Sequence, residues 1–133
     1  MSAFSDFLEN KILDHILGGG DYSRPPTVHV ALYTAGPTDA GGGTEVSGNN
    51  YARVAITNNN TNFPAASSGQ KQNGAVITFP TATGAWGTVS HVGIFDAPGG
   101  GHLLMHASLS QAKLIENGDT PTWPIGALTF ILD

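Results

Sequence analysis

The histidines are the first residues to consider for chemistry, because imidazole nitrogens bind transition metals. His102 and His106 are four residues apart, a spacing that brings two rings together on a helix. The surrounding segment has the alternating pattern of a strand, in which four residues span about 13 Å. One ion bonds each nitrogen at about 2 Å, so it cannot join these two rings. We therefore expect no metal site within one chain, and a site shared between symmetry-related subunits stays open.

The sequence lacks the usual motifs of nucleophilic and phosphate chemistry. It contains no cysteine and no Gly-x-Ser-x-Gly motif, and no glycine cluster is followed by Lys-Ser or Lys-Thr. A glycosidase needs two facing carboxylates, but the candidate acidic residues all lie where turns are expected. These candidates are Asp39, Glu45, Asp96 and Asp119. We predict a non-enzymatic protein with no catalytic residues, no metal and no cofactor.

The charge composition limits the possible partners. Five Lys and Arg residues stand against ten Asp and Glu residues, which gives a net charge of −5. A protein that binds nucleic acid needs a cationic face, and so few cations cannot build one. The longest apolar run near the N-terminus is no longer than Ile12-Leu13, so the sequence predicts neither a signal peptide nor a membrane span. We expect no nucleic acid and no membrane as partners.

The first regular element that could position functional side chains is a helix at about residues 5–17. Ser5 can cap it, Asp6 and Glu9 suit the positive end of its dipole, and glycines from Gly18 stop it. The helix is apolar on more than one side. An i, i+4 row is formed by Phe4, Leu8, Ile12 and Ile16, whereas Phe7, Leu13 and Leu17 lie outside it. The helix is predicted either to close one end of its own domain or to dock on a partner.

After the helix the apolar period changes to two, as in strands. Short strands separated by Gly, Pro and Asn turns predict a mainly β fold, an antiparallel β-sandwich or jelly roll with one N-terminal α-helix, as a single domain over residues 1–133. Residues 58–74 form a long polar connection, of a length that is usually functional or interfacial. In the last strand, Leu128, Phe130 and Leu132 are expected to face inward. The strands are expected at residues 27–34, 51–57, 75–79, 89–95, 102–109, 112–115 and 127–133.

Two tryptophans are candidates for a contact surface. Trp86 and Trp123 lie beside turn residues rather than in the middle of a strand. They can cap the ends of a sandwich, anchor a protein interface, or form a platform for sugar rings. Phe63, in the long connection, is a further apolar candidate.

An ordered series of segments along nearly the whole chain resembles a family of small virion proteins from tailed bacteriophages, often described as tail-fibre-like. The segments are FLENKILDH (7–15), VALYT (30–34), PTDA (37–40), GTEVSG (43–48), YAR (51–53), WGTV (86–89), VGIFD (92–96) and LTFILD (128–133). The resemblance implies a structural virion component without enzymatic activity. It carries over no binding or catalytic residues.

Two positions on the virion are compatible with this resemblance. The first choice is a capsid cement (decoration) protein, a homotrimer that clamps neighbouring major capsid protein subunits and adds buried area between them. The alternative is a tail-fibre or adsorption component that binds host surface glycans, and a free carbohydrate-binding or other cellular β-sandwich module is a third interpretation. The predicted contact residues are Phe4, Phe7, Leu8, Ile12, Leu13, Ile16, Leu17, Phe63, Trp86 and Trp123.

Overall fold

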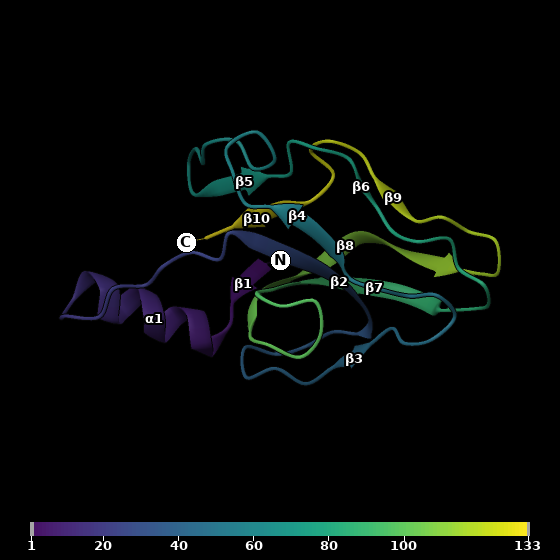
Figure 1. Ribbon diagram of the computed structural model, residues 1–133, viewed down its shortest axis with the longest axis horizontal. Coiled ribbons are helices and arrows are strands. Elements are labelled where there is room, and N and C mark those ends of the chain that lie inside the picture. The colour runs from purple at the N-terminus through teal and green to yellow at the C-terminus, as the bar shows by residue number, and fades with distance from the viewer. Residues whose placement is uncertain (1, 133) are drawn as a thin grey trace.

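The computed structural model describes residues 2–132 and consists mainly of antiparallel strands with one helix near the N-terminus (Figure 1). The predicted fold class is thereby confirmed. The elements are β1 (Ser2–Phe4), α1 (Asp6–Ile16), β2 (Thr27–Ala35), β3 (Thr44–Glu45), β4 (Val54–Thr57), β5 (Gln70–Gln72), β6 (Ile77–Thr78), β7 (Gly87–Phe95), β8 (Leu103–Ile115), β9 (Thr122–Trp123) and β10 (Thr129–Ile131).

The main sheet is centred on the long strands β2, β7 and β8. Its order is β1-β8-β7-β2-β3, and β4 also pairs with β2, beside the stretch that pairs with β3. Alternating residues of β2 point to opposite faces, which is why Val28, Val30 and Leu32 all enter the core and are at most 6% exposed. The other face carries a smaller buried cluster that includes Tyr33 and Phe95.

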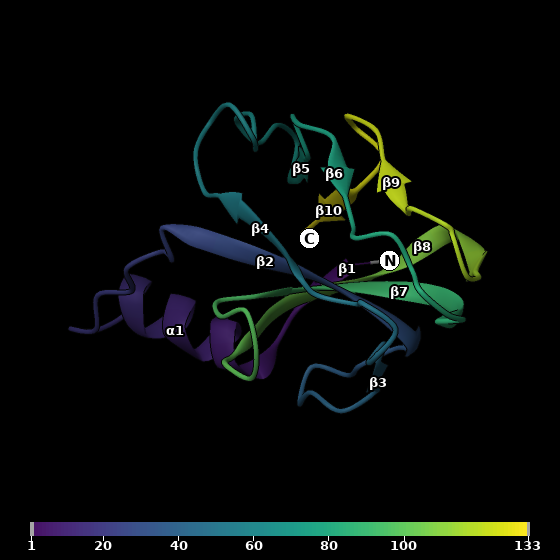
Figure 2. The ribbon, with the colours of Figure 1, turned by 45° about the vertical axis from the view of Figure 1, so that its right-hand side comes forward.

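A second layer lies over the inner face of this sheet (Figure 2). It contains two short antiparallel ladders, β5 with β10 and β6 with β9, joined by irregular segments. Its side chains Ile77, Phe79, Leu128 and Phe130 are buried in the same core as the inner residues of β2 and β7. The arrangement is a sandwich whose second layer is only partly regular.

The first and last strands join the two layers at one edge. The hydroxyl of Ser2 donates to the carbonyl oxygen of Ile131 at 2.9 Å and accepts from the Ile131 N–H at 2.6 Å. Helix α1 starts from this edge and projects from one end of the molecule (Figure 1). At 11 residues it is too short to cross a membrane, and the described residues contain no other helix.

Several predicted boundaries were wrong. The two strands expected at 102–109 and 112–115 form one strand, β8, which bulges where pairing moves from Val89–Lys113 to His91–Ser108. The connection 58–74 contains β5, because its residues pair with the C-terminal strand. Leu132 is 42% exposed instead of facing inward, since β10 ends at Ile131, and Asp133 lies outside the described residues.

Candidate interaction surface

The N-terminus of α1 is fixed to the main sheet by Ser5. Its hydroxyl accepts the N–H of Leu8 at 3.2 Å, as a helix cap does, and donates to the carbonyl oxygen of Leu103. Its own N–H donates to Leu104 O at 2.8 Å. The predicted cap is therefore confirmed, and it also sets the direction in which the helix leaves the sheet. Phe4, expected to begin the helical row, lies in β1 opposite Met105.

The far end of α1 exposes three neighbouring aliphatic side chains. Leu13, Ile16 and Leu17 are 58%, 70% and 76% exposed, and we call them the helix knob. Leu8 is buried, whereas Ile12 is half-buried against the core. A helix end of this kind is unusual, because single exposed apolar residues are common but clusters mark interaction sites.

An apolar pocket of about 320 Å³ lies beside the inner face of the helix and is open to solvent. The helix and the segment after it form one wall, through Leu8, Ile12 and Tyr22. Strands of the main sheet form the floor, and Phe63 and Phe130 come from the second layer. Phe63 of the predicted contact set thus lines a pocket together with α1.

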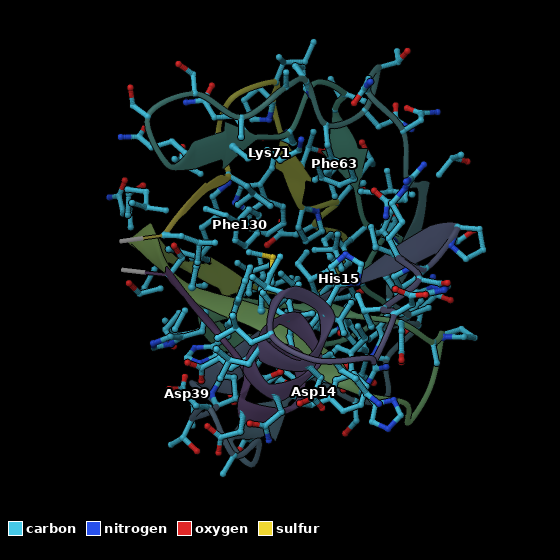
Figure 3. All side chains as sticks on the ribbon, turned by 90° about the vertical axis from the view of Figure 1, so that its left-hand side faces the viewer. Asp14, His15, Asp39, Phe63, Lys71 and Phe130 are labelled. Carbon is cyan, nitrogen blue, oxygen red and sulfur yellow. The ribbon has the colours of Figure 1, made fainter. Side chains whose placement is uncertain are left out.

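Two cations border this pocket. Arg24 follows the helix, and Lys71 lies in β5 on the opposite side. Neither has an ion pair with any residue of the described range 2–132. In Figure 3, Lys71, Phe63 and Phe130 lie in the upper layer, above the helix residues Asp14 and His15. The site therefore combines an apolar interior with positive charge at its border.

A ring stack holds the first turn of α1 against the β7–β8 loop. The rings of Phe7 and His102 are parallel, with centroids 3.9 Å apart. His102 is held in turn by Asp96, which accepts its backbone N–H at 2.7 Å and lies 3.0 Å from its Nδ1. Burial alone would raise the pKa of Asp96, but these hydrogen bonds outweigh it and the pKa lies below its ordinary value. Phe7 of the predicted contact set is thus already in contact within the chain.

This carboxylate gives a pH-dependent prediction. A lowered folded-state pKa means that ionised Asp96 stabilises the fold above the unfolded-state pKa of about 4, and that the contribution is lost as pH falls through the folded value. We expect Asp96→Asn to lower the free energy of unfolding by about 1 kcal/mol at neutral pH and by less under acid conditions. Urea unfolding of both proteins across the acidic range measures this difference. A constant difference at every pH would contradict it, and Asp21→Asn, at a side chain that is 97% exposed, is the control.

Arg53 is the centre of a second polar network, on the outer face of the sheet. Its guanidinium holds both carboxylate oxygens of Glu45 at 2.9 and 2.8 Å, and it donates to the carbonyl oxygens of Ala97 and Gly100. The hydroxyl of Tyr51 donates to the same carboxylate at 2.7 Å. Burial would raise the pKa of Glu45, but the hydrogen bonds from Arg53 and Tyr51 hold it below its ordinary value. All these groups are satisfied within the chain, so the network is structural.

Of the three alternatives for the tryptophans, the exposed platform for sugar rings is not formed. Trp86 and Trp123 are 6% and 5% exposed. The indole N–H of Trp86 donates to Asn49 O at 2.9 Å, and Trp123 packs edge-on to Phe79 with Lys113 over its ring. Both are core residues because their polar atoms or faces find partners within the chain. Neither is available to a sugar or to a partner surface, which corrects their place among the predicted contact residues.

The two histidines considered for metal binding have separate partners. His102 directly precedes β8 and contacts Asp96, whereas Nε2 of His106 lies 2.8 Å from Asp39. Oxygens of Asp6, Glu9 and Asp39 lie within 4.8 Å of one another beside His106, and all three side chains are exposed. Exposed acidic groups of this kind are common without an ion, and we assign no metal site to them.

Sequence reasoning found the helix and Phe63 but missed the border of the pocket. Arg24 and Lys71 are isolated cations in turn-rich segments, and no local pattern connects them. Only the pairing of β5 with β10 brings Lys71 to the helix side of the molecule. The pocket residues from the second layer were hidden for the same reason.

The described residues thus form a small two-layer β domain with an exposed apolar helix end and polar groups that are paired within the chain. The chain is a member of the family described as podophage GP4 fiber I protein gp80, whose family model it matches over residues 3–131. A search of curated proteins found no match. The predicted resemblance to tail-fibre-like virion proteins is therefore confirmed, and the chain is a structural protein of a tailed-phage virion with other virion proteins as partners.

Proposed function

We propose that this protein is a non-enzymatic component of a tail fibre that is held in the virion through the helix knob. The exposed cluster of Leu13, Ile16 and Leu17 carries the proposal, because an isolated domain gains nothing from leaving three adjacent aliphatic side chains in water. The fibre family supports the location on the tail. The rigid attachment of the helix at Ser5 supports a fixed contact rather than a flexible one.

The non-enzymatic part of the proposal is supported by the state of the polar side chains. Asp96, Glu45 and His106 each have a partner that fixes a loop or a strand. A catalytic group must instead point at a site where a substrate can bind. The apolar pocket offers mostly aliphatic and aromatic side chains, which hold surfaces together but do not transfer protons.

Addition of purified protein to phage particles that lack it, followed by electron cryo-microscopy, tests the proposal. We expect density at the tail, restored adsorption to host cells, and little binding of a Leu17→Asp variant. Leu114→Asp is the matched control, because Leu114 is also exposed, at 60%, but lies near the far end of β8. Regular density over the head with restored resistance to heat would overturn the fibre assignment in favour of the capsid cement prediction. Equal binding of Leu17→Asp and the wild type would overturn the role of the knob.

A further inference from the structure

We infer that the apolar pocket of one copy receives the helix knob of a second copy. This inference deepens the proposed function by naming a partner for the knob, and it can be tested without the virion. The knob does not fill its own pocket, since Leu13, Ile16 and Leu17 are absent from the lining and stay 58–76% exposed. The cap at Ser5 prevents the helix from turning inward, because it fixes the helix to β8.

The knob, as donor, and the pocket, as acceptor, are both apolar and therefore chemically complementary. The knob presents Leu13 and Ile16 on the last turn of α1 and Leu17 at its C-cap. The pocket presents Phe63, Phe130 and Ile12 around an apolar space of about 320 Å³. Burial of these aliphatic side chains in the pocket removes apolar surface from water, which drives association. When a helix docks in a groove, its apolar anchor residues lie at positions i, i+3 and i+4. Leu13, Ile16 and Leu17 have this spacing in the sequence.

The charges favour a second copy over an unrelated apolar ligand. Asp14 and Asp21 flank the knob and are exposed, whereas Arg24 and Lys71 border the pocket without ion pairs among residues 2–132. Asp21 contacts His15 only at 3.8 Å, with its side chain 97% exposed. Acidic residues around the donor and basic residues around the acceptor are complementary, which sets orientation and favours encounter. One chain thus carries both halves of the interface.

Such an interface has consequences for assembly. When the donor and acceptor are different surfaces, repetition of the contact closes into a ring or continues as a filament. Because α1 carries the knob at its end and also lines the pocket through Leu8 and Ile12, two or three copies can also exchange knobs around a closed symmetry axis. The homotrimer that was predicted together with the capsid cement interpretation would be one such closed form.

Sedimentation analysis of the full chain tests the inference. We expect a mass above the monomer that depends on concentration, and a roughly 10- to 100-fold weaker association for Leu17→Asp. Leu114→Asp should associate like the wild type. A monomer at every concentration up to about 1 mM would overturn the inference. Association that Leu17→Asp leaves unchanged would also overturn it, because another surface would then be responsible.

A charge exchange provides the sharper measurement. Arg24→Glu with Lys71→Glu, or Asp14→Lys with Asp21→Lys, should each weaken association because like charges then meet. The fourfold variant that combines both pairs should recover association. It keeps the net charge of −5, because two cations and two anions exchange sign, so a general charge effect is controlled.

Failure of the fourfold variant to recover association, while circular dichroism shows a folded protein, would overturn the proposed pairing of pocket border and knob. These results do not depend on where the protein lies in the virion, so they are distinguishable from a failure of the fibre proposal.

Discussion

Phe79→Ala is expected to lower the free energy of unfolding by about 4 kcal/mol. Phe79 is 2% exposed and is among the largest fully buried side chains. Its ring lies between the two layers, 6.3 Å from the ring of Tyr51 and 5.6 Å from that of Trp123. Removal of the ring leaves a cavity between the two layers, and a close-packed core relaxes only in part around such a cavity. Urea unfolding followed by tryptophan fluorescence measures the loss.

Val76→Ala is the control for this prediction. Val76 lies three residues earlier in the same segment but is 56% exposed, so its truncation should change stability by less than about 0.5 kcal/mol. Phe79→Leu keeps most of the volume and should lose only about 1.5 kcal/mol. If Phe79→Ala lost no more than Val76→Ala, the two layers would not be packed around this ring.

Local patterns predicted the parts of the fold that depend on neighbouring residues. Ser5 followed by acidic residues predicted the start of α1, and the alternation of Val28, Val30 and Leu32 predicted β2. The patterns failed where a distant strand decides the outcome. Residues Ser110 and Gln111 have no strand preference, yet they continue β8 because β7 pairs with its two ends and leaves a bulge between them.

The candidate surface could be predicted only in part for the same physical reason. The knob was visible because Ile16 ends the main apolar row of the helix, whereas Leu13 and Leu17 fall outside that row and make the helix apolar on a second side. The pocket was not visible, since its walls come from segments that meet only after β5 and β10 pair. The position of Trp86 depends on an acceptor, the carbonyl oxygen of Asn49, that no local pattern reveals.

Arg53→Ala is expected to lower the free energy of unfolding by about 3 kcal/mol. The side chain of Arg53 is 8% exposed, and its loss would leave the Glu45 carboxylate, itself 25% exposed, without its main donor. The carbonyl oxygens of Ala97 and Gly100 would lose their donor as well. The ring of Phe95, which the guanidinium covers at 3.6 Å, would gain access to water. Denaturant unfolding at neutral pH measures the total.

Arg53→Lys separates the role of charge from that of shape. A lysine keeps the positive charge but cannot donate to both oxygens of Glu45 and to the β7–β8 loop at once, so about 2 kcal/mol should still be lost. Arg24→Ala is the matched control at protein concentrations where the wild type is monomeric, because Arg24 is an exposed cation without an ion pair in the described part of the chain, and its loss should then leave stability nearly unchanged. Wild-type stability of Arg53→Lys would show that charge alone suffices. The expected loss, in contrast, would show that the planar guanidinium is needed to hold Glu45 and the β7–β8 loop together. This loop leads to His102, whose ring stacks on Phe7 in the first turn of α1. The network of Glu45, Tyr51 and Arg53 therefore helps to fix the helix from which the knob projects.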